Sequence, residues 1–133
     1  MEYHQKYIRV SAKDLDELQH VNNVRYLEWI QDISKEHWQL KAPEELQKEL
    51  IWVVLSHHIQ YKKAAFLDEE LLLTTHVACN SGVTSNRVVE IYHKERGLLV
   101  KSETAWCLLN ASTKKPMRIP EAVMNLFPNA ANS

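Results

Sequence analysis

One long helical pattern, between residues 23 and 40, stands among segments that have the character of β-strands. Its apolar side chains recur at helical spacing, and a second stripe through Val24, Leu27 and Ile30 widens the apolar face. A helix that is apolar over so much of its surface needs a further layer to cover it. The recurring positions are Tyr26, Trp29, Ile30, Ile33, His37 and Leu40.

The strand-like segments are expected to supply this layer. One precedes the helix and four follow it, and turns at residues 80–82 and 95–97 join them into hairpins. This order predicts a single α+β domain, residues 1–133, with its helices on one face of an antiparallel sheet. The predicted strands are residues 3–10, 50–61, 71–79, 84–93 and 98–110, with short helical pieces near 42–46 and 120–127.

Composition removes several classes of function. Gly82 and Gly97 are the only glycines, which excludes Gly-rich phosphate loops. The net charge of −1 and the lack of a basic stripe argue against nucleic-acid binding. No apolar run is long enough for a membrane span, and residues 1–6 do not look like a signal peptide. We therefore expect a cytoplasmic protein, away from membranes, in which Cys79 and Cys107 are free thiols.

The segment before the helix concentrates polar chemistry. Two aspartates, a histidine and two asparagines lie within ten residues, a composition that makes a poor core and a good site. Part of it has a purely structural explanation, because Asn22 or Asn23 can cap the helix. Asp14 is expected to brace the loop through a bond to the backbone.

This segment resembles the loop-to-helix signature of hotdog-fold acyl thioesterases, most closely acyl-carrier-protein thioesterases and the related bacterial acyl-CoA thioesterases. The family pattern is Asp-x-Asp-x-x-(Gly/Gln)-His-Val-Asn-Asn-x-x-Tyr-x-x-Trp. The resemblance implies a hotdog fold, in which a curved antiparallel sheet wraps a long central helix. It also implies a homodimer that closes an open sheet edge, with tetramers as a higher assembly. The positions that carry the pattern are Asp14, Asp16, Gln19, His20, Val21, Asn22, Asn23, Tyr26 and Trp29.

The activity implied by the resemblance is hydrolysis of an acyl-ACP or acyl-CoA thioester to a free fatty acid and a thiol, without a metal or other cofactor. Asp16 corresponds to the acid that activates water or attacks the carbonyl. His20 either assists catalysis or packs in the loop. Asn23 matches a position that holds a catalytic His in some bacterial relatives.

The remaining site assignments concern substrate binding. The free N–H groups of Asn23 and Val24 at the helix start are expected to bind the thioester carbonyl. Tyr26 and Trp29 are candidate acyl-chain liners, with plain core packing as the alternative for each. The phosphates of CoA or of a pantetheine arm have four candidate partners, each of which can equally be a solvated surface charge. These are Arg87, Lys62, Lys63 and Arg118.

Two departures from the family pattern and two other functions stay open. Leu18 stands where plant enzymes carry Asn, which weakens transfer of their mechanism, and Gln19 stands where many bacterial relatives carry Gly. The alternatives are a non-catalytic acyl-CoA-binding hotdog module and a hotdog 3-hydroxyacyl dehydratase. No metal site is expected, because His57 and His58 are neighbours on a strand and point to opposite faces.

Overall fold

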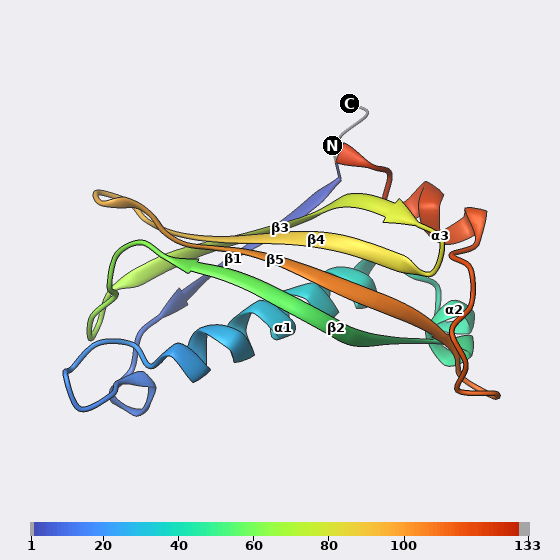
Figure 1. Cartoon of the computed structure of the whole chain (residues 1–133). Helices are drawn as coiled ribbons and strands as arrows, with labels where there is room; N and C mark the ends of the chain where they lie inside the picture. The colour runs from blue at the N-terminus through green and yellow to red at the C-terminus, as the bar shows by residue number, and fades with distance from the viewer. Residues whose placement is uncertain (1, 131–133) are drawn as a thin grey trace.

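A five-stranded antiparallel sheet arches over the long helix α1, Asn23–Lys41, in the computed structural model, which describes residues 2–130 (Figure 1). The strands lie in the order β1-β3-β4-β5-β2. The predicted α+β class and order of elements are confirmed, and the polar loop also contains a short 3₁₀ turn, η1, Ala12–Asp14. The other elements are β1, Tyr3–Arg9; α2, Glu44–Glu49; β2, Leu50–Tyr61; β3, Glu70–Ser81; β4, Thr84–His93; β5, Gly97–Asn110; and α3, Glu121–Leu126.

The core lies between α1 and the concave face of the sheet. Ile30 and Ile33 are fully buried against strand residues such as Leu73 and Ile91. Full burial of a side chain of this size contributes about 1.5–3 kcal/mol. The predicted apolar face of the helix is too wide at both ends, because Val24 and Leu40 are 61% and 68% exposed.

A second core cluster lies toward the α3 end of the sheet. It joins residues from β2, β3 and β5 to the C-terminal segment, and Trp38 of α1 packs against it. Both cysteines are free thiols; Cys107 is buried and Cys79 is only partly buried. No helix within residues 2–130 is long and apolar enough to cross a membrane. The buried members of the cluster are Leu50, Val77, Leu108, Ile119, Val123 and Phe127.

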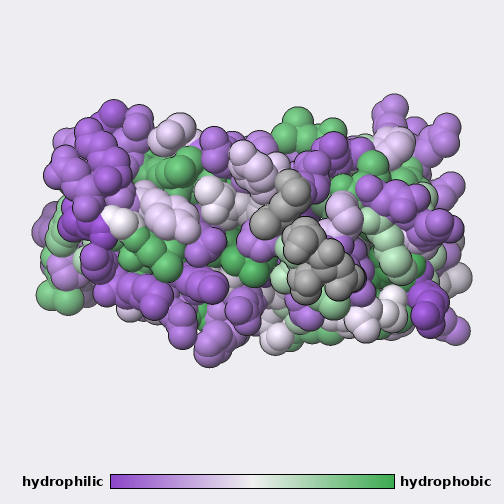
Figure 2. Space-filling model, turned by 90° about the horizontal axis from the view of Figure 1, so that it is seen from above, coloured by the Kyte–Doolittle hydropathy of each residue, from purple (hydrophilic) through white to green (hydrophobic). Residues whose placement is uncertain are grey.

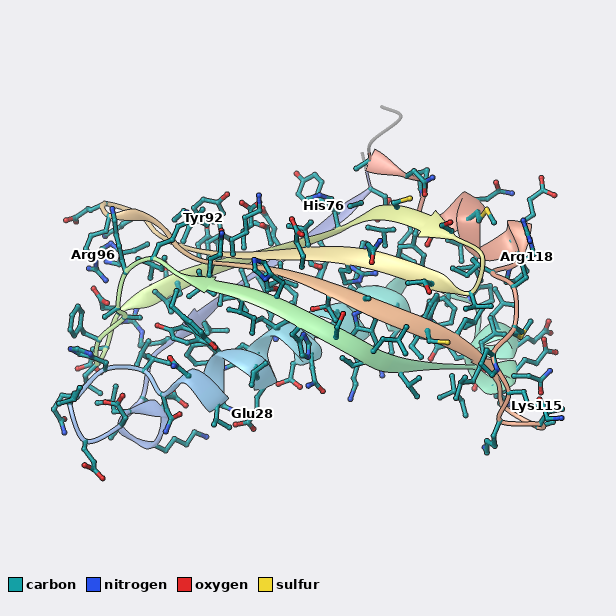
Figure 3. The ribbon with its side chains drawn as sticks, in the orientation of Figure 1. Glu28, His76, Tyr92, Arg96, Lys115 and Arg118 are labelled. Atoms are coloured by element: carbon teal, nitrogen blue, oxygen red, sulfur yellow. The ribbon has the colours of Figure 1, made fainter. Side chains whose placement is uncertain are left out.

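Charged side chains fix the loop between β2 and β3 at the end where α1 begins. Arg96 donates two hydrogen bonds to the Glu69 carboxylate, at 2.5 and 2.7 Å, and a third to the Ala64 carbonyl at 3.1 Å. Its guanidinium also lies over the Phe66 ring. Figure 3 shows Arg96 at this end of the molecule and Arg118 at the other. The loop is therefore held in place beside the start of α1.

The sheet has two free edges and an outer face that α1 does not cover. Strands β1 and β2 are the edges, and β2 carries a bulge between Val54 and Ser56. The outer face, seen from above in Figure 2, is mostly hydrophilic with separate hydrophobic patches. On β2, the apolar side chains of Val53 and Leu55 are exposed. The open edge expected from the sequence is thus present, with apolar groups on it.

A buried polar relay crosses the middle of the fold. His37 of α1 is 1% exposed; its Nδ1 accepts from Arg87 at 2.9 Å, and its Nε2 lies 3.1 Å from the Glu2 carboxylate. Burial lowers the pKa of His37 to about 4, although the bond to Glu2 acts in the opposite direction. The imidazole is therefore neutral at pH 7, with Nε2 as the donor to Glu2.

This relay predicts a loss of stability in mild acid. The pKa of His37 is near 6.5 in the unfolded chain and near 4 in the folded protein. Its contribution to the free energy of unfolding is therefore fully present above pH 6.5. That contribution is lost as the pH falls from 6.5 toward 4, because the unfolded state then binds more protons. The His37 contribution to the free energy of unfolding should fall by about 2 kcal/mol between pH 7 and pH 5.

Urea unfolding at both pH values measures the effect. In His37→Gln, an amide can still accept from Arg87 and donate to Glu2, but it does not titrate. The drop in stability between pH 7 and pH 5 should be smaller in this variant than in the wild type. An equal drop in both proteins would show that His37 is not responsible.

Candidate active site

Asp16 sits in a tight turn that uses only one of its two carboxylate oxygens. Oδ1 accepts from the backbone N–H groups of Leu18, at 2.9 Å, and His20, at 3.2 Å. The backbone closes the same turn, with the Asp16 N–H donating to the His20 carbonyl at 2.7 Å. Oδ2 accepts no hydrogen bond from residues 2–130. One carboxylate oxygen is therefore fixed and the other is available for chemistry.

Gln19 takes the left-handed backbone conformation in this turn, with φ of 63°. A side chain there costs roughly 1–2 kcal/mol relative to the usual conformation, and glycine avoids that cost. This explains the preference for Gly at this position in the related enzymes. The departure at Gln19 therefore adds backbone strain but is compatible with a left-handed residue in the turn.

Asp14 holds the loop against the helix, as predicted. Its side chain is 3% exposed and accepts from the Ser11 N–H at 2.8 Å, the Ser11 hydroxyl at 3.1 Å and Arg25 Nε at 2.7 Å. Burial alone would raise the pKa of Asp14, but the bonds from Ser11 and Arg25 outweigh it and lower the pKa. The Asp14 carbonyl also accepts from the Asn22 N–H at 2.9 Å. Asp14 is thus structural and tied to the start of α1.

The two asparagines at the helix start divide their roles. Asn22 is the N-cap, and its Oδ1 accepts from the Val24 N–H at 2.9 Å. The Val24 N–H is therefore engaged by the cap, which removes it from the predicted pair of carbonyl donors. The Asn23 N–H donates to no residue of the described chain. Asn23 remains the backbone donor at the positive end of the helix dipole.

A cavity of about 220 Å³ opens beside this helix start. It brings together four of the predicted site residues: Asp16, His20, Asn23 and Tyr26. Sequence reasoning missed Tyr61 and Ala64 as liners; Lys62 and Lys63, considered there only for phosphate binding, also line it. The signal for all four was their place at the end of a predicted strand. The lining residues are Asp16, His20, Val21, Asn23, Tyr26, Tyr61, Lys62, Lys63 and Ala64.

Two predicted substrate contacts lie elsewhere. Trp29 is 5% exposed and packs edge-on against Tyr26 in the core, so the core alternative applies to it. Arg87 is 7% exposed and lines a separate cavity toward α3, which shares no lining residue with the cavity at Asp16. The structure therefore gives no support to its predicted role as a CoA contact at the Asp16 site.

His20 lines the cavity and also packs in the loop. Its ring lies edge-on to Phe66, with 5.2 Å between the ring centroids. Neither ring nitrogen bonds to another part of the described chain. Packing fixes the ring while its nitrogens stay available, so the structure accommodates both predicted roles of His20.

Tyr26 places a hydroxyl without a partner in the wall of the cavity. The residue is 3% exposed, and its hydroxyl makes no hydrogen bond within the described chain. Burial raises the pKa of Tyr26 to about 12, against an opposing effect of the Ala65 backbone N–H, which lies outside hydrogen-bond geometry. The phenol is therefore neutral and can donate. A buried hydroxyl without an acceptor costs about 1–3 kcal/mol. This cost points to a missing partner beside the cavity.

The other predicted features fall outside this site. His57 is partly buried and contacts the Thr104 hydroxyl at 2.7 Å, whereas the adjacent His58 is exposed. They do lie on opposite faces of β2. Across residues 2–130, no three His, Cys, Asp or Glu side chains group in a way that could hold a metal ion.

Comparison with solved structures identifies proteins of similar fold. A probable thioesterase from Escherichia coli, YbaW, is 23% identical over 92% of this chain and 94% of its own, with a TM-score of 0.79. A probable thioesterase from Bartonella henselae is 27% identical over 89% and 98%, with a TM-score of 0.74. The Staphylococcus aureus protein SAV2348, solved in complex with CoA, is 13% identical over 94% and 81%, with a TM-score of 0.83.

Comparison with protein families identifies the family and its activity. No curated protein matches the sequence. The acyl-ACP thioesterase N-terminal domain family matches residues 1–127, nearly the whole chain. Together with the structural matches, this confirms the predicted hotdog fold and thioester hydrolysis. The chain therefore belongs to the family of the acyl-ACP thioesterase N-terminal domain and is a hotdog-fold thioesterase.

Proposed function

We propose that the chain hydrolyses acyl-CoA or acyl-ACP thioesters in the cavity at the start of α1, with Asp16 as the catalytic carboxylate. The observation that carries this is the free Asp16 Oδ2 in the same cavity as the free Asn23 N–H. A general base and a carbonyl donor are the two groups that hydrolysis of a thioester requires. The two products are the free fatty acid, which carries the acyl group, and the free thiol of the carrier.

In the proposed reaction, the Asn23 N–H and the Tyr26 hydroxyl bind the thioester carbonyl. Asp16 Oδ2 takes a proton from water as the oxygen adds to the carbonyl carbon. The carbon–sulfur bond then breaks, and the proton passes to the departing thiolate. Each carbonyl donor contributes about 3 kcal/mol in reactions of this type. His20, beside Asp16 in the cavity wall, is proposed to assist by orienting the water.

Two lysines are proposed to bind the phosphate groups of the carrier in place of Arg87. Lys62 and Lys63 are exposed and line the mouth of the cavity. Lys63 Nζ donates to the Arg96 carbonyl at 2.6 Å, which orients it, and Lys62 makes no ion pair with the rest of the described chain. CoA and the phosphopantetheine arm of a carrier protein both present anions to such groups.

The central prediction concerns Asp16. In Asp16→Asn, the amide oxygen can still accept from Leu18 and His20, but no group remains to take the proton. Hydrolysis should fall by about 10²–10⁴-fold with folding intact. Release of free thiol from a panel of acyl-CoAs and acyl carrier proteins measures the activity, and circular dichroism checks the fold.

Glu17→Gln is the matched control, because Glu17 is exposed and does not line the cavity. It should retain the wild-type rate. Full activity in Asp16→Asn would reject the assignment. Tight binding of acyl-CoA to wild-type protein without thiol release would favour the non-catalytic alternative, and hydration of an enoyl substrate would favour the dehydratase.

A second prediction separates catalysis from stability at Tyr26. Tyr26→Phe removes a buried hydroxyl that has no partner, so the free energy of unfolding should stay the same or rise. The turnover number should nevertheless fall, by about tenfold or more, if the hydroxyl binds the carbonyl in the transition state. Tyr7→Phe, on the exposed face of β1, should change neither quantity. A stability loss with unchanged turnover would make Tyr26 structural.

We also propose that the protein forms a homodimer by pairing the β2 edges of two subunits. We propose a reducing cytoplasm as its location, since both cysteines are free thiols. Three observations support the choice of β2. It is an edge strand, it exposes Val53 and Leu55, and it ends at Tyr61 in the cavity wall. A partner paired there would lie beside the site. A tetramer of such dimers is compatible with the same pairing.

The β2 pairing predicts that Leu55→Lys weakens the dimer. A lysine at the edge of a sheet discourages pairing between strands. Light scattering after size exclusion should show a shift toward monomer at micromolar concentration. Tyr7→Lys, which places the same charge on the β1 edge, should remain dimeric. The reverse result would move the interface to β1.

A further inference from the structure

A second cavity, of about 140 Å³, lies under the other half of α1 and next to α3. It shares no lining residue with the Asp16 cavity. Along α1, its first lining residue, Ser34, is about 16 Å from Asn23 at the helical rise of 1.5 Å per residue. The family assignment and the proposed reaction leave this cavity unused.

The cavity contains a buried arginine without an acidic partner. Arg87 Nη1 donates to His37 Nδ1 at 2.9 Å and to the Thr75 hydroxyl at 3.1 Å, both uncharged acceptors. Its Nε and Nη2 donate to no described residue, and no carboxylate within residues 2–130 forms an ion pair with it. Glu2 is reached only through His37, and Lys41 also contacts that carboxylate at 3.5 Å.

The Phe127 ring, with its centroid 5.6 Å from the Arg87 guanidinium carbon, offers a cation–π contact, but no anion of the described chain balances the charge. An unpaired buried charge costs several kcal/mol, and proteins normally pair it or neutralise it. Burial lowers the pKa of Arg87 only to about 10, so the guanidinium stays charged at pH 7. The buried charge is thus retained and lacks a carboxylate partner within the described chain.

Among the described residues that line the cavity, the one other charged side chain is also a cation. No aspartate or glutamate lines the cavity, and Lys35 adds a second cation at its exposed rim. The Trp106 Nε1–H is buried without an acceptor, and the hydroxyl of the adjacent Ser85 has no partner in the described chain. Ser34, Gln39 and Asn80 add uncharged polar groups, and the rest of the wall is apolar or aromatic, formed by Trp38, Trp52, Val77, Trp106, Val123 and Phe127.

We propose that this cavity is a binding site for an organic monocarboxylate with an apolar body, anchored by Arg87. A carboxylate fits the guanidinium as a planar acceptor of two hydrogen bonds and balances one buried charge with one. A phosphate would bring up to two charges and three strongly hydrated oxygens into a wall that is largely indole and phenyl. The aromatic wall calls for an apolar body beside the acid group.

The class of ligand includes the free acid that a thioesterase releases. Only this link to the reaction depends on the proposed function; the binding site itself depends on the cavity and on Arg87. The test below therefore measures binding without turnover. Binding should be the same in Asp16→Asn, so failure of the catalytic proposal and failure of this one can be told apart.

The four tryptophans provide a direct readout. Trp38, Trp52 and Trp106 line this cavity, whereas Trp29 lies in the core near the Asp16 end. Sodium octanoate is the probe, titrated into the full-length ¹⁵N-labelled protein while the indole N–H resonances are followed. The Trp106 resonance should shift most, in a saturable way. Acetate, with no apolar body, and 1-octanol, with no charge, should both bind at least about tenfold more weakly.

Arg87→Met keeps an unbranched apolar stem and removes the charged guanidinium. Octanoate affinity should fall by about tenfold or more, the size expected for a charge-assisted pair. The melting temperature should not fall in parallel, because an unbalanced buried charge is removed. Arg118→Met, at an exposed arginine at the same end of the molecule (Figure 3), should bind octanoate like the wild type.

Two results would overturn the proposal. One is octanoate binding that shifts only the Trp29 resonance, or that is equally tight in Arg87→Met. The other is no saturable shift of the cavity indoles in wild-type protein. If Arg87→Met does not fold, Trp106→Phe replaces it: this variant keeps an aromatic wall, removes one donor, and should lower octanoate affinity without affecting 1-octanol.

Discussion

The candidate active site depends on one buried carboxylate that performs no chemistry. Asp14 gathers the Ser11 backbone and hydroxyl, the Arg25 guanidinium and, through its own carbonyl, the Asn22 N–H. These bonds join the polar loop to the first turn of α1. Removing Asp14 would cost stability, but less than breaking a fully buried ion pair, because the Arg25 side chain is 29% exposed. Here the larger consequence would be positional, because Asp16 and the Asn23 N–H come together only while the loop is held.

Unpaired polar groups mark both ends of the fold. Within residues 2–130, three side-chain polar atoms that are completely shielded from solvent have no hydrogen-bond partner: His4 Nε2, Tyr26 Oη and Trp106 Nε1. Tyr26 lines the cavity at the start of α1, and Trp106 lines the one beside α3. Native proteins leave few such groups, and each calls for an explanation. A bound ligand at each cavity explains two of the three.

The sequence predicted the layers of the fold well and the surroundings of single side chains less well. The helix and strand patterns depend on many residues at once, so errors at one position hardly matter. Val24 and Arg87 were misplaced because each was judged alone. Arg87 shares the two-residue period of Ser85, Val89 and Ile91, which are all buried, and this alternation was a signal that it points inward. The charge of the residue outweighed that signal.

The N-cap and the catalytic turn show why some of the site was beyond sequence reasoning. Both asparagines can cap a helix, and only the backbone path decides that Asn22 does so and leaves the Asn23 N–H free. The same holds for Asp16, whose turn fixes Oδ1 with two N–H groups and leaves Oδ2 open. A carboxylate bonded through both oxygens would be a brace, like Asp14, and a poorer base. The difference between the two acids therefore lies in which oxygens the loop occupies, and this depends on a left-handed residue at position 19.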